Sequence, residues 1–426
     1  MKFKSLFSLI FLLAICAEIA IGRVIDNRLI IYGLNISLII SLTYLFSSII
    51  VLSSISDIYL YKSKFLLYSF FAAIIIIHPI LWLIYGINSL PISIYGHSYQ
   101  DTIIHTSEHG FLKAAEYGVF KFLNFILITI PICIIVVEKF GYNEVRNIYL
   151  ILLLLVFLLL FFATFGFFET PREDGRISIL GGGPIIFGRW MGFGVLTIFF
   201  LPLNRNFLVK LFFIFFFIFF CFSSGSRGPV LALILTFLLY FFLNFKKILL
   251  KTIFALSVIC GLLFFTDLPK NLFNVGKIER VFLNISGSSQ STQTRFELVD
   301  RSIELMAKYP FGIGMGNWQY MANEYNTSFL IPHKYPHNLL LELINEHGII
   351  VASLFVLLLI YSIYLGYMKM CSYSSEKSSI YNFLFYLSVY LFLNVMLSGS
   401  LNDSRLLFVT LCCIMIRKPL LGKYEK

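Results

Sequence analysis

The sequence contains few charged residues. Only 13% of its 426 residues are charged, about half of the roughly 25% found in an ordinary soluble domain. Acidic residues are the scarcer kind, with 22 Asp and Glu against 33 Lys and Arg. A soluble fold needs polar and charged side chains to cover its outside. The low charge content therefore excludes a soluble globular protein.

Cysteine is also sparse, and basic residues form no long run. Six of the seven cysteines fall in apolar segments, and Cys371 lies in a short polar one. This distribution predicts neither a disulfide framework nor a metal-ligand spacing. The net charge of +11 comes from Lys and Arg residues scattered over short segments. It does not indicate a nucleic-acid-binding protein, because such a segment would carry a block of like charges.

Apolar residues dominate instead, with 59% hydrophobic residues and 48 phenylalanines. Runs of about 17 to 25 apolar residues cross the hydrocarbon core of a bilayer, and they must be helical because lipid leaves backbone polar groups no other partner. The sequence predicts an all-α integral membrane protein, a single membrane domain over 1–426 with about 12 transmembrane helices. The predicted spans are 5–22, 29–52, 65–87, 118–137, 147–168, 187–203, 207–223, 229–245, 249–266, 347–368, 380–398 and 404–417.

The first of these spans resembles a secretory signal, because Lys2 and Lys4 precede the apolar run Leu6 to Ala17. We expect an uncleaved first helix, since further spans follow at once, and cleavage is the alternative.

Orientation follows from the positions of Lys and Arg, which favour the cytoplasmic side. With the N-terminus inside, the inner segments hold 17 of the 33 basic residues and five of the 22 acidic ones. Both termini are then expected in the cytoplasm. Helices 1–9 occupy residues 1–266, a long extracytoplasmic (periplasmic) loop occupies 267–338, and helices 10–12 occupy 339–426.

The long loop contains a predicted amphipathic helix over 294–310. Thr294 and Glu297 have the spacing of a capping box, and Pro310 supplies a stop. Arg295 in the first turn could bind an anion together with the positive helix end. A solvated arginine on a surface helix is the alternative. The predicted apolar face consists of Phe296, Val299, Ile303 and Met306.

Three glycines follow this helix in the run Phe311 to Trp318. They resemble a dinucleotide-binding fingerprint only superficially, because no strand precedes them. We expect a flexible turn. Similarly, His105 to His109 matches the H-x-x-E-H pattern of zinc proteases. No convincing third ligand follows, so no metal site is expected.

Two further residues stand where an apolar helix meets an outer segment. His337 lies in Pro336-His337-Asn338, and a neutral imidazole there could act as a general base. A structural or solvated histidine is the alternative. Arg227 lies in a short turn between two predicted spans, where an arginine is costly unless it pairs or lines a wet cavity.

Together these motifs resemble the O-antigen ligase and O-antigen polymerase superfamily of bacterial membrane glycosyltransferases. The resemblance covers roughly 170–350. It rests first on the Ser-Arg-Gly turn at Arg227 and on the run Thr294 to Gly314. It rests also on the run Pro336 to Leu340, which Glu346-His347-Gly348 follows, and on the run Arg176 to Pro184 together with Arg189.

The resemblance implies a glycan donor on a polyprenyl diphosphate in the outer leaflet, and transfer to an acceptor hydroxyl with neither a metal nor a cofactor. Guanidinium groups suit phosphate oxygens and stay charged. Arg227 and Arg295 match the two arginines of the family and are the expected diphosphate ligands, with Arg189 and Arg301 as possible helpers. His337 matches the histidine of the family and is the expected catalytic base of an inverting transfer.

We therefore expect a glycosyltransferase of surface polysaccharide biosynthesis (O-antigen or capsule) in the bacterial inner membrane. A polymerase, whose acceptor is another lipid-linked repeat, is favoured by the run Gly181 to Pro184, and a ligase to lipid A–core is the alternative. A chain-length regulator is a possible partner. A transporter is the less favoured alternative, because it would need ionisable residues within the spans as a coupling pathway. Glu18 and His78 are the residues that lie clearly within them. The sugar, the linkage and the oligomeric state do not follow from the sequence.

Overall fold

The structure is a computed structural model, and every structural statement below concerns the residues that it describes. These are 3–20, 30–31, 34–55, 62–86, 91–92, 112–168, 176–177, 179, 183–203, 206–245, 290–318, 321–322, 336–372 and 376–416.

Apart from turns and two pairs of two-residue strands, the described chain is helical, so the predicted all-α class is confirmed. Strand β1 (Ile30–Ile31) pairs with β2 (Leu34–Asn35), and β3 (Pro91–Ile92) pairs with β4 (Leu112–Lys113). The helices are α1 (Phe3–Ala20), α2 (Ile36–Ser53), α3 (Lys62–Leu81), α5 (Ala114–Asn124), α6 (Ile130–Lys139), α7 (Tyr142–Phe165), α8 (Pro184–Phe200), α9 (Phe207–Ser223), the helix Arg227–Phe245, α13 (Gln290–Lys308), α15 (Leu339–Ser372), α16 (Glu376–Ser398) and α17 (Arg405–Met415). Single turns η1 (Trp82–Gly86), η2 (Phe125–Thr129) and η4 (Asn402–Ser404) complete the set.

Six of the described helical segments are long and apolar enough to cross a membrane, and four shorter apolar helices accompany them. This supports a membrane protein with several spans. The total of twelve stays a prediction, because the expected span 249–266 lies outside the described residues. The six are Lys64–Tyr85, Gly118–Lys139, Tyr142–Phe165, Arg227–Phe245, Leu339–Ser372 and Ser379–Ser398.

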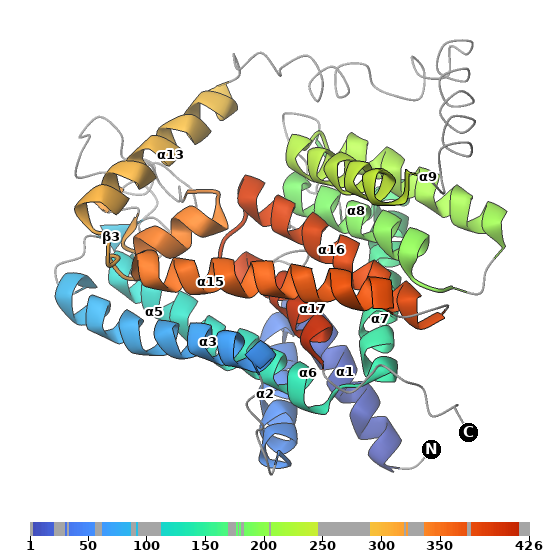
Figure 1. Cartoon of the computed structure of the whole chain (residues 1–426), viewed down its shortest axis with the longest axis horizontal. Helices are drawn as coiled ribbons and strands as arrows, with labels where there is room; N and C mark the ends of the chain where they lie inside the picture. The colour runs from blue at the N-terminus through green and yellow to red at the C-terminus, as the bar shows by residue number, and fades with distance from the viewer. Residues whose placement is uncertain are drawn as a thin grey trace.

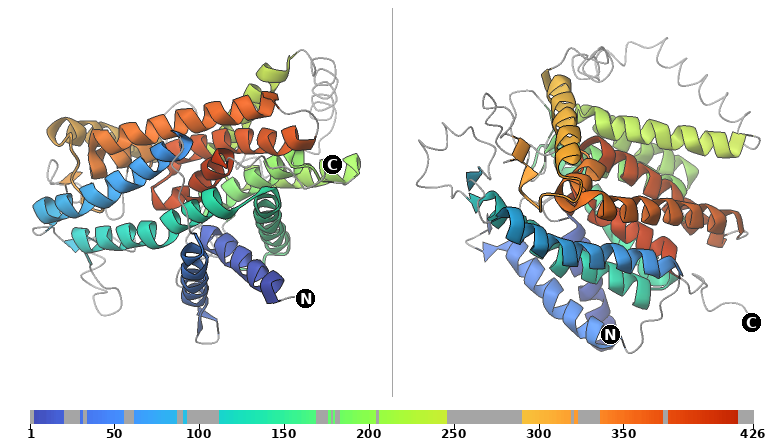
Figure 2. Two further views of the ribbon diagram at one scale, coloured as in Figure 1. Left: turned by 60° about the horizontal axis from the view of Figure 1, so that its bottom comes forward. Right: turned by 60° about the vertical axis from the view of Figure 1, so that its left-hand side comes forward.

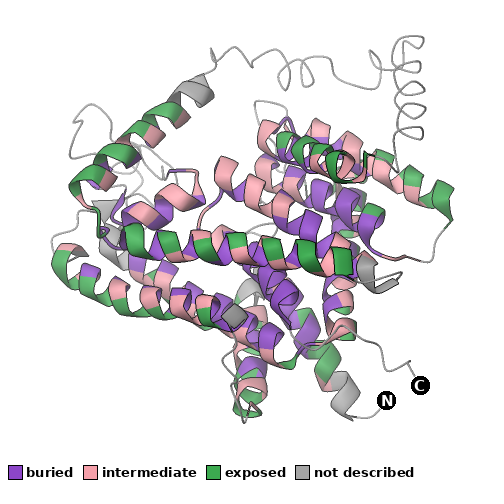
Figure 3. Ribbon diagram, viewed as in Figure 1, coloured by how far each residue is buried: buried purple, intermediate pink, exposed green. Residues whose placement is uncertain are grey.

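Helix α16 lies at the centre of the bundle. It packs against α15, α8 and α17, while α15 also lies along α3 (Figure 1). Helices α1 and α2 pair on the opposite side from α8 and α9 (Figure 2). Exposed residues form a band along the outer side of α15, whereas α16 is mostly buried (Figure 3). Such an apolar outer band suits contact with lipid tails.

Glycines on α8 let its neighbours approach closely. A methyl group on Gly192 would lie 2.1 Å from Tyr390 Oη, and one on Gly188 would lie 2.7 Å from Ser224 Oγ. Small residues at helix interfaces serve membrane bundles in this way, because van der Waals packing drives the association of helices in lipid. They hold α8 against both α16 and the turn that contains Arg227.

Aromatic rings fill the centre of the bundle. Phe70, Phe355 and Phe408 are all buried, with ring centroids 5.7 to 6.0 Å apart. These rings come from α3, α15 and α17, so aromatic packing joins these three helices.

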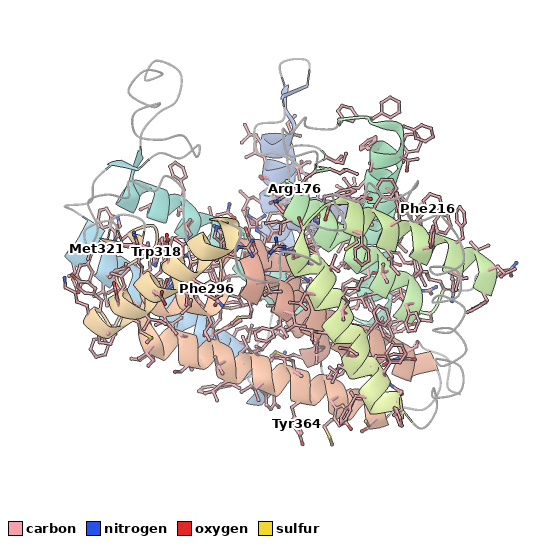
Figure 4. The ribbon with its side chains drawn as sticks, turned by 90° about the horizontal axis from the view of Figure 1, so that it is seen from above. Arg176, Phe216, Phe296, Trp318, Met321 and Tyr364 are labelled. Atoms are coloured by element: carbon pink, nitrogen blue, oxygen red, sulfur yellow. The ribbon has the colours of Figure 1, made fainter. Side chains whose placement is uncertain are left out.

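Helix α13 confirms the predicted amphipathic helix but not its predicted face. Phe296 and Ile303 are 63% and 47% exposed. The buried face carries Leu298, Ser302 and Leu305, and Leu298 and Leu305 pack in one cluster with Trp318 and Met321. Figure 4 shows Phe296 on one side of α13, with Trp318 and Met321 on the other. The prediction was wrong because Ser302 made the packed face look polar.

Helix α15 also begins earlier than the predicted span at 347. Gly348 has non-helical angles (φ 84°, ψ 172°) and divides α15 into a short first part from Leu339 and a long second part. The first part carries buried polar residues, which a hydropathy window leaves out of a span.

Candidate active site

The C-terminal end of α16 collects side chains from distant parts of the chain. The last four carbonyls of any helix have no partner within it, and α16 has no basic residue in its last turn. Arg189 Nη2 of α8 donates at 3.2 Å to the carbonyl of Asn394, the residue just before these last four. Arg295 Nη1 of α13 donates to the carbonyl of Leu397 at 3.4 Å. The helix end thereby brings two of the predicted arginines to one place.

The run Pro336-His337-Asn338 contacts the same end of α16 through the side chain of Asn338. Its Nδ2 donates to the carbonyl of Met396 at 3.0 Å. Its Oδ1 accepts from the backbone N–H groups of Leu340 and Leu341 at 3.0 and 3.1 Å. Asn338 is therefore the N-cap of α15 and a link to α16 at once.

His337, just before this cap, is half-buried and has a φ of +52°. Non-glycine residues rarely adopt this left-handed region, although His does so more readily than most. Such backbone angles cost of order 1–3 kcal/mol and cluster at functional sites. The neighbouring residue Asn338 is bonded both to α16 and to the first turn of α15, and these contacts fix the backbone next to His337.

The Arg227 turn packs onto the same end of α16. Gly228 faces the side chain of Leu397, and a methyl group on Gly228 would lie 3.6 Å from Leu397 Cβ. Gly225 has a φ of +62°, and a methyl group there would lie 3.2 Å from Cγ of Arg176. Figure 4 shows Arg176 near the middle of the molecule. Sequence reasoning named Arg176 only as part of a motif, and the structure places it beside the turn.

Arg301 is the one predicted arginine whose described hydrogen bond leads elsewhere. Its Nη1 donates to the carbonyl of Ala322 at 3.5 Å. Arg301 therefore braces the segment packed under α13, whereas Arg295 on the same helix reaches α16.

The glycine-rich run forms a turn, as expected, but a closely packed one. Gly312, Gly314 and Gly316 all have positive φ angles, from 82° to 94°. A methyl group on Gly312 would lie 2.6 Å from the backbone nitrogen of Gly348. The backbone N–H of Gly314 donates to the carbonyl of Glu346 at 2.8 Å. Only glycine allows these two backbones to meet, so the turn is fixed against the break in α15.

A buried ionic cluster that the sequence analysis missed stands behind this turn. Lys121 Nζ of α5 lies 2.6 Å from Glu342 Oε1 and 2.8 Å from Glu346 Oε1. The three side chains are 10%, 1% and 3% exposed. One cation thus serves two carboxylates, a group we call the lysine cluster. The available signal was a lysine within the predicted span 118–137, because a charge in a span needs a partner.

The lysine cluster also ties two backbone turns to α15. Glu346 Oε1 accepts from the N–H of Gly316 at 2.9 Å. Glu342 Oε2 accepts from the N–H of Leu401, just after α16, at 2.9 Å. The cluster therefore fixes the glycine turn and the end of α16 relative to the first part of α15.

Two buried histidines adjoin the lysine cluster. His347 is 1% exposed, and its ring centroid lies 6.3 Å from that of His78. Neither ring nitrogen of His347 has a hydrogen-bond partner among the described residues. The backbone N–H of Met315 lies 3.4 Å from His78 Nδ1. These histidines belong to the packed support of the site, unlike half-buried His337.

The described residues contain no group of three His, Cys, Asp or Glu side chains that could hold a metal ion. The H-x-x-E-H run at 105–109 lies outside the described residues. The described contacts bring the guanidinium groups of Arg189 and Arg295 to the end of α16 that Asn338, the residue after His337, also reaches. Guanidinium groups suit the oxygens of a phosphate or diphosphate.

The fold and this site define a polytopic α-helical membrane protein with a cationic site between its helix ends. Residues 212–356 match the family model described as O-antigen ligase, which confirms the resemblance to the O-antigen ligase and polymerase superfamily. The match contains Arg227, Arg295, Arg301 and His337, and Arg189 precedes it. No curated protein matches the chain. The family match supports an activity of the ligase and polymerase type.

Proposed function

We propose that the protein transfers a glycan from a polyprenyl diphosphate to an acceptor hydroxyl, with His337 as the base and Arg227 and Arg295 as diphosphate ligands. The observation that supports this most is that Arg189, Arg295 and the cap residue Asn338 all donate to carbonyls near the C-terminal end of α16. The elements that carry them are far apart in the sequence, yet two candidate cations and the residue next to the candidate base contact one helix end.

The proposed reaction is a single displacement at the anomeric carbon. The acceptor oxygen attacks this carbon while its proton passes to the imidazole of His337. The bond between the anomeric carbon and the diphosphate oxygen breaks, and the diphosphate leaves with the electron pair. Attack opposite to the leaving group inverts the anomeric centre. Guanidinium groups stabilise the charge that develops on the diphosphate, and this stabilisation is greatest where water is excluded.

The main-chain carbonyls of α16 suit this role as resting partners for the arginines. A carbonyl is a neutral acceptor, whereas a diphosphate oxygen is charged, and charge-assisted hydrogen bonds are roughly twice as strong as neutral ones. A diphosphate oxygen would therefore be a stronger acceptor for Arg189 and Arg295 than these carbonyls are. Arg301, held at Ala322, would act only as a helper.

We favour a polymerase, whose acceptor is another lipid-linked repeat unit, on the resemblance of Gly181 to Pro184 and Arg189 to polymerase-like sequences. A ligase that transfers to lipid A–core is the second candidate, because the matching family model is described as O-antigen ligase. Lipid-linked glycan analysis in a deletion strain separates the two. Single repeats on lipid A–core indicate a lost polymerase, long chains left unattached indicate a lost ligase, and unchanged glycans contradict both.

The proposed chemistry needs the site on the outer side of the membrane. The exposed residue Lys308, at the end of α13, is expected outside, and exposed Cys371, at the end of α15, is expected inside. In intact cells a membrane-impermeant thiol reagent should label Lys308→Cys in a Cys371→Ser background. It should label native Cys371 only after permeabilisation, with the Cys371→Ser variant as the control. The reverse pattern would contradict the outward-facing site.

A further inference from the structure

A cavity of about 560 Å³ lies between α7, α8 and α9, at the opposite end of α8 from the candidate active site. Arg189 of the site stands near the start of α8, and Ile198 in the cavity wall stands nine residues later. That separation is about 13 Å along the helix at 1.5 Å per residue. The cavity is thus a separate place, which the proposed function does not use.

The inner wall of the cavity is apolar. Six of its eight lining side chains are aliphatic or aromatic. Leu153 and Ile198 are almost fully buried in it, and the rings of Phe157 and Phe213 meet edge to face with centroids 4.8 Å apart. Val209, 42% exposed, stands at the outer edge. A water-soluble anion would find few partners on such a wall, whereas a hydrocarbon chain would bury apolar surface there.

The other two lining side chains are cations, Arg146 and Lys210. Neither forms an ion pair with a described residue. Arg146 Nε is buried and has no hydrogen-bond partner in the described part of the chain. The acid nearest in sequence, Glu144, instead accepts from the backbone N–H of Gly141 at 3.0 Å. Among the described lining residues, the cavity therefore has two positive charges and no carboxylate.

Two helix ends add to this positive charge. Helix α7 begins at Tyr142, about one turn before Arg146. Helix α9 begins at Phe207, about one turn before Lys210. A helix N-terminus carries a partial positive charge. The first turns of α9 continue as an exposed apolar surface, with Phe207 and Phe212 exposed by 75% and 55%. In Figure 4 α9, marked by Phe216, lies away from α13.

From these observations we propose that the cavity binds an anionic glycerophospholipid, with its phosphate between Arg146 and Lys210 and one acyl chain along the apolar wall. The mixture of cations, apolar wall and open lipid-facing edge fits a lipid better than a free anion. The predicted orientation puts this end of the bundle at the cytoplasmic leaflet, where basic pockets between helices bind anionic headgroups. The proposal does not depend on the proposed glycosyl transfer.

The test is native mass spectrometry of the full-length protein in detergent, titrated with phosphatidylglycerol or phosphatidylcholine. A basic residue near an anionic headgroup strengthens binding about fivefold. Arg146→Gln combined with Lys210→Gln should therefore weaken phosphatidylglycerol binding about 25-fold. Lys139→Gln is the matched control, because Lys139 is exposed, belongs to the neighbouring helix α6, and donates to the carbonyl of Ser54.

A second variant separates the cavity from charge alone. Val209→Trp should fill the edge of the cavity and reduce phosphatidylglycerol binding while both cations remain. Inorganic phosphate added at the same concentrations should not compete. The proposal is overturned if phosphatidylcholine binds as tightly as phosphatidylglycerol, or if the double Gln variant binds like the Lys139→Gln control.

Discussion

Two groups of buried or half-buried cations contact the end of α16 and the first part of α15, and the described contacts of the two groups differ in kind. At the end of α16, the described hydrogen bonds of Arg189 and Arg295 go to neutral main-chain carbonyls. In the lysine cluster, Lys121 meets two carboxylates within 2.6 to 2.8 Å. A charged oxygen of a ligand is a stronger acceptor for an arginine than a main-chain carbonyl is. Lys121 cannot leave its carboxylates, because a buried charge without its partner is strongly destabilising.

The two groups differ in what they are suited to do. Arg189 and Arg295, which donate to carbonyls, are suited to bind a charged ligand. The lysine cluster, in which a cation meets two carboxylates, is suited to fix backbone positions. The lysine cluster ties the glycine turn at Gly316 and the turn at Leu401 to the first part of α15. The N-cap of α15 is Asn338, the residue after His337. Mutations in the first group should therefore affect activity more than stability, and mutations in the second should affect stability more than activity.

The largest effect on activity is expected from Arg227→Ala and Arg295→Ala. Truncating one partner of a buried charged pair costs about 2–5 kcal/mol, a factor of about 30 or more, in donor retention and transfer. Arg→Lys should also be poorly tolerated, because an ammonium cannot reproduce the guanidinium fork. Glycan transfer by purified variants and retention of lipid-linked donor measure this effect.

Arg301→Ala is the matched control for Arg295→Ala, because both arginines lie on α13 and Arg301 donates to Ala322 instead of α16. Its loss of activity should be smaller. If both Ala variants at Arg227 and Arg295 keep full activity, the assignment of a diphosphate site fails.

The next effect concerns stability. Lys121→Met leaves Glu342 and Glu346 buried without their cation and should cost about 3–5 kcal/mol. Thermal unfolding in detergent should show a clear drop in the midpoint temperature. Adding Glu342→Gln and Glu346→Gln to Lys121→Met should restore part of it, because no buried charge is then left alone. An unchanged midpoint in the single variant would contradict the structural role of the cluster.

A smaller effect is expected from Gly118→Ala on α5. The added methyl group would lie 1.9 Å from the carbonyl oxygen of Met315, and such overpacking typically costs about 1–3 kcal/mol. Gly366→Ala is the control, because its methyl group would meet the movable side chain of Ile414 at 3.3 Å. Equal unfolding midpoints for the two variants would show that α5 and the glycine turn are not packed as described.

Most helices and the three site motifs were predictable from the sequence. Apolar runs predicted most helices, because lipid selects strongly for length and hydropathy. Their polar ends were misplaced: α7 begins at Tyr142 and not at 147, since its first turn carries Glu144, which accepts from the N–H of Gly141. The motifs at Arg227, Arg295 and His337 were found because each is local in the sequence.

The rest depended on contacts across long stretches of chain. Lys121 and Glu346 are 225 residues apart, and no local pattern joins them. The sequence analysis identified Glu346 only as part of the run Glu346-His347-Gly348. The packed face of α13 was missed because burial of Ser302 depends on the Trp318 indole, which donates to its hydroxyl at 3.2 Å. Pairing of this kind follows from the tertiary fold and not from periodicity.

The central claim is that His337 performs chemistry while its neighbours hold the structure, and His337→Asn tests it most directly. Asn tolerates the left-handed backbone region, so this variant removes the imidazole without adding strain at φ +52°. We expect an unchanged unfolding midpoint, unchanged retention of the lipid-linked donor, and a rate of transfer about 10²–10⁴-fold lower, as for the loss of a positioned base. Turnover near the wild-type rate would contradict this role of His337 and would place the base on another group.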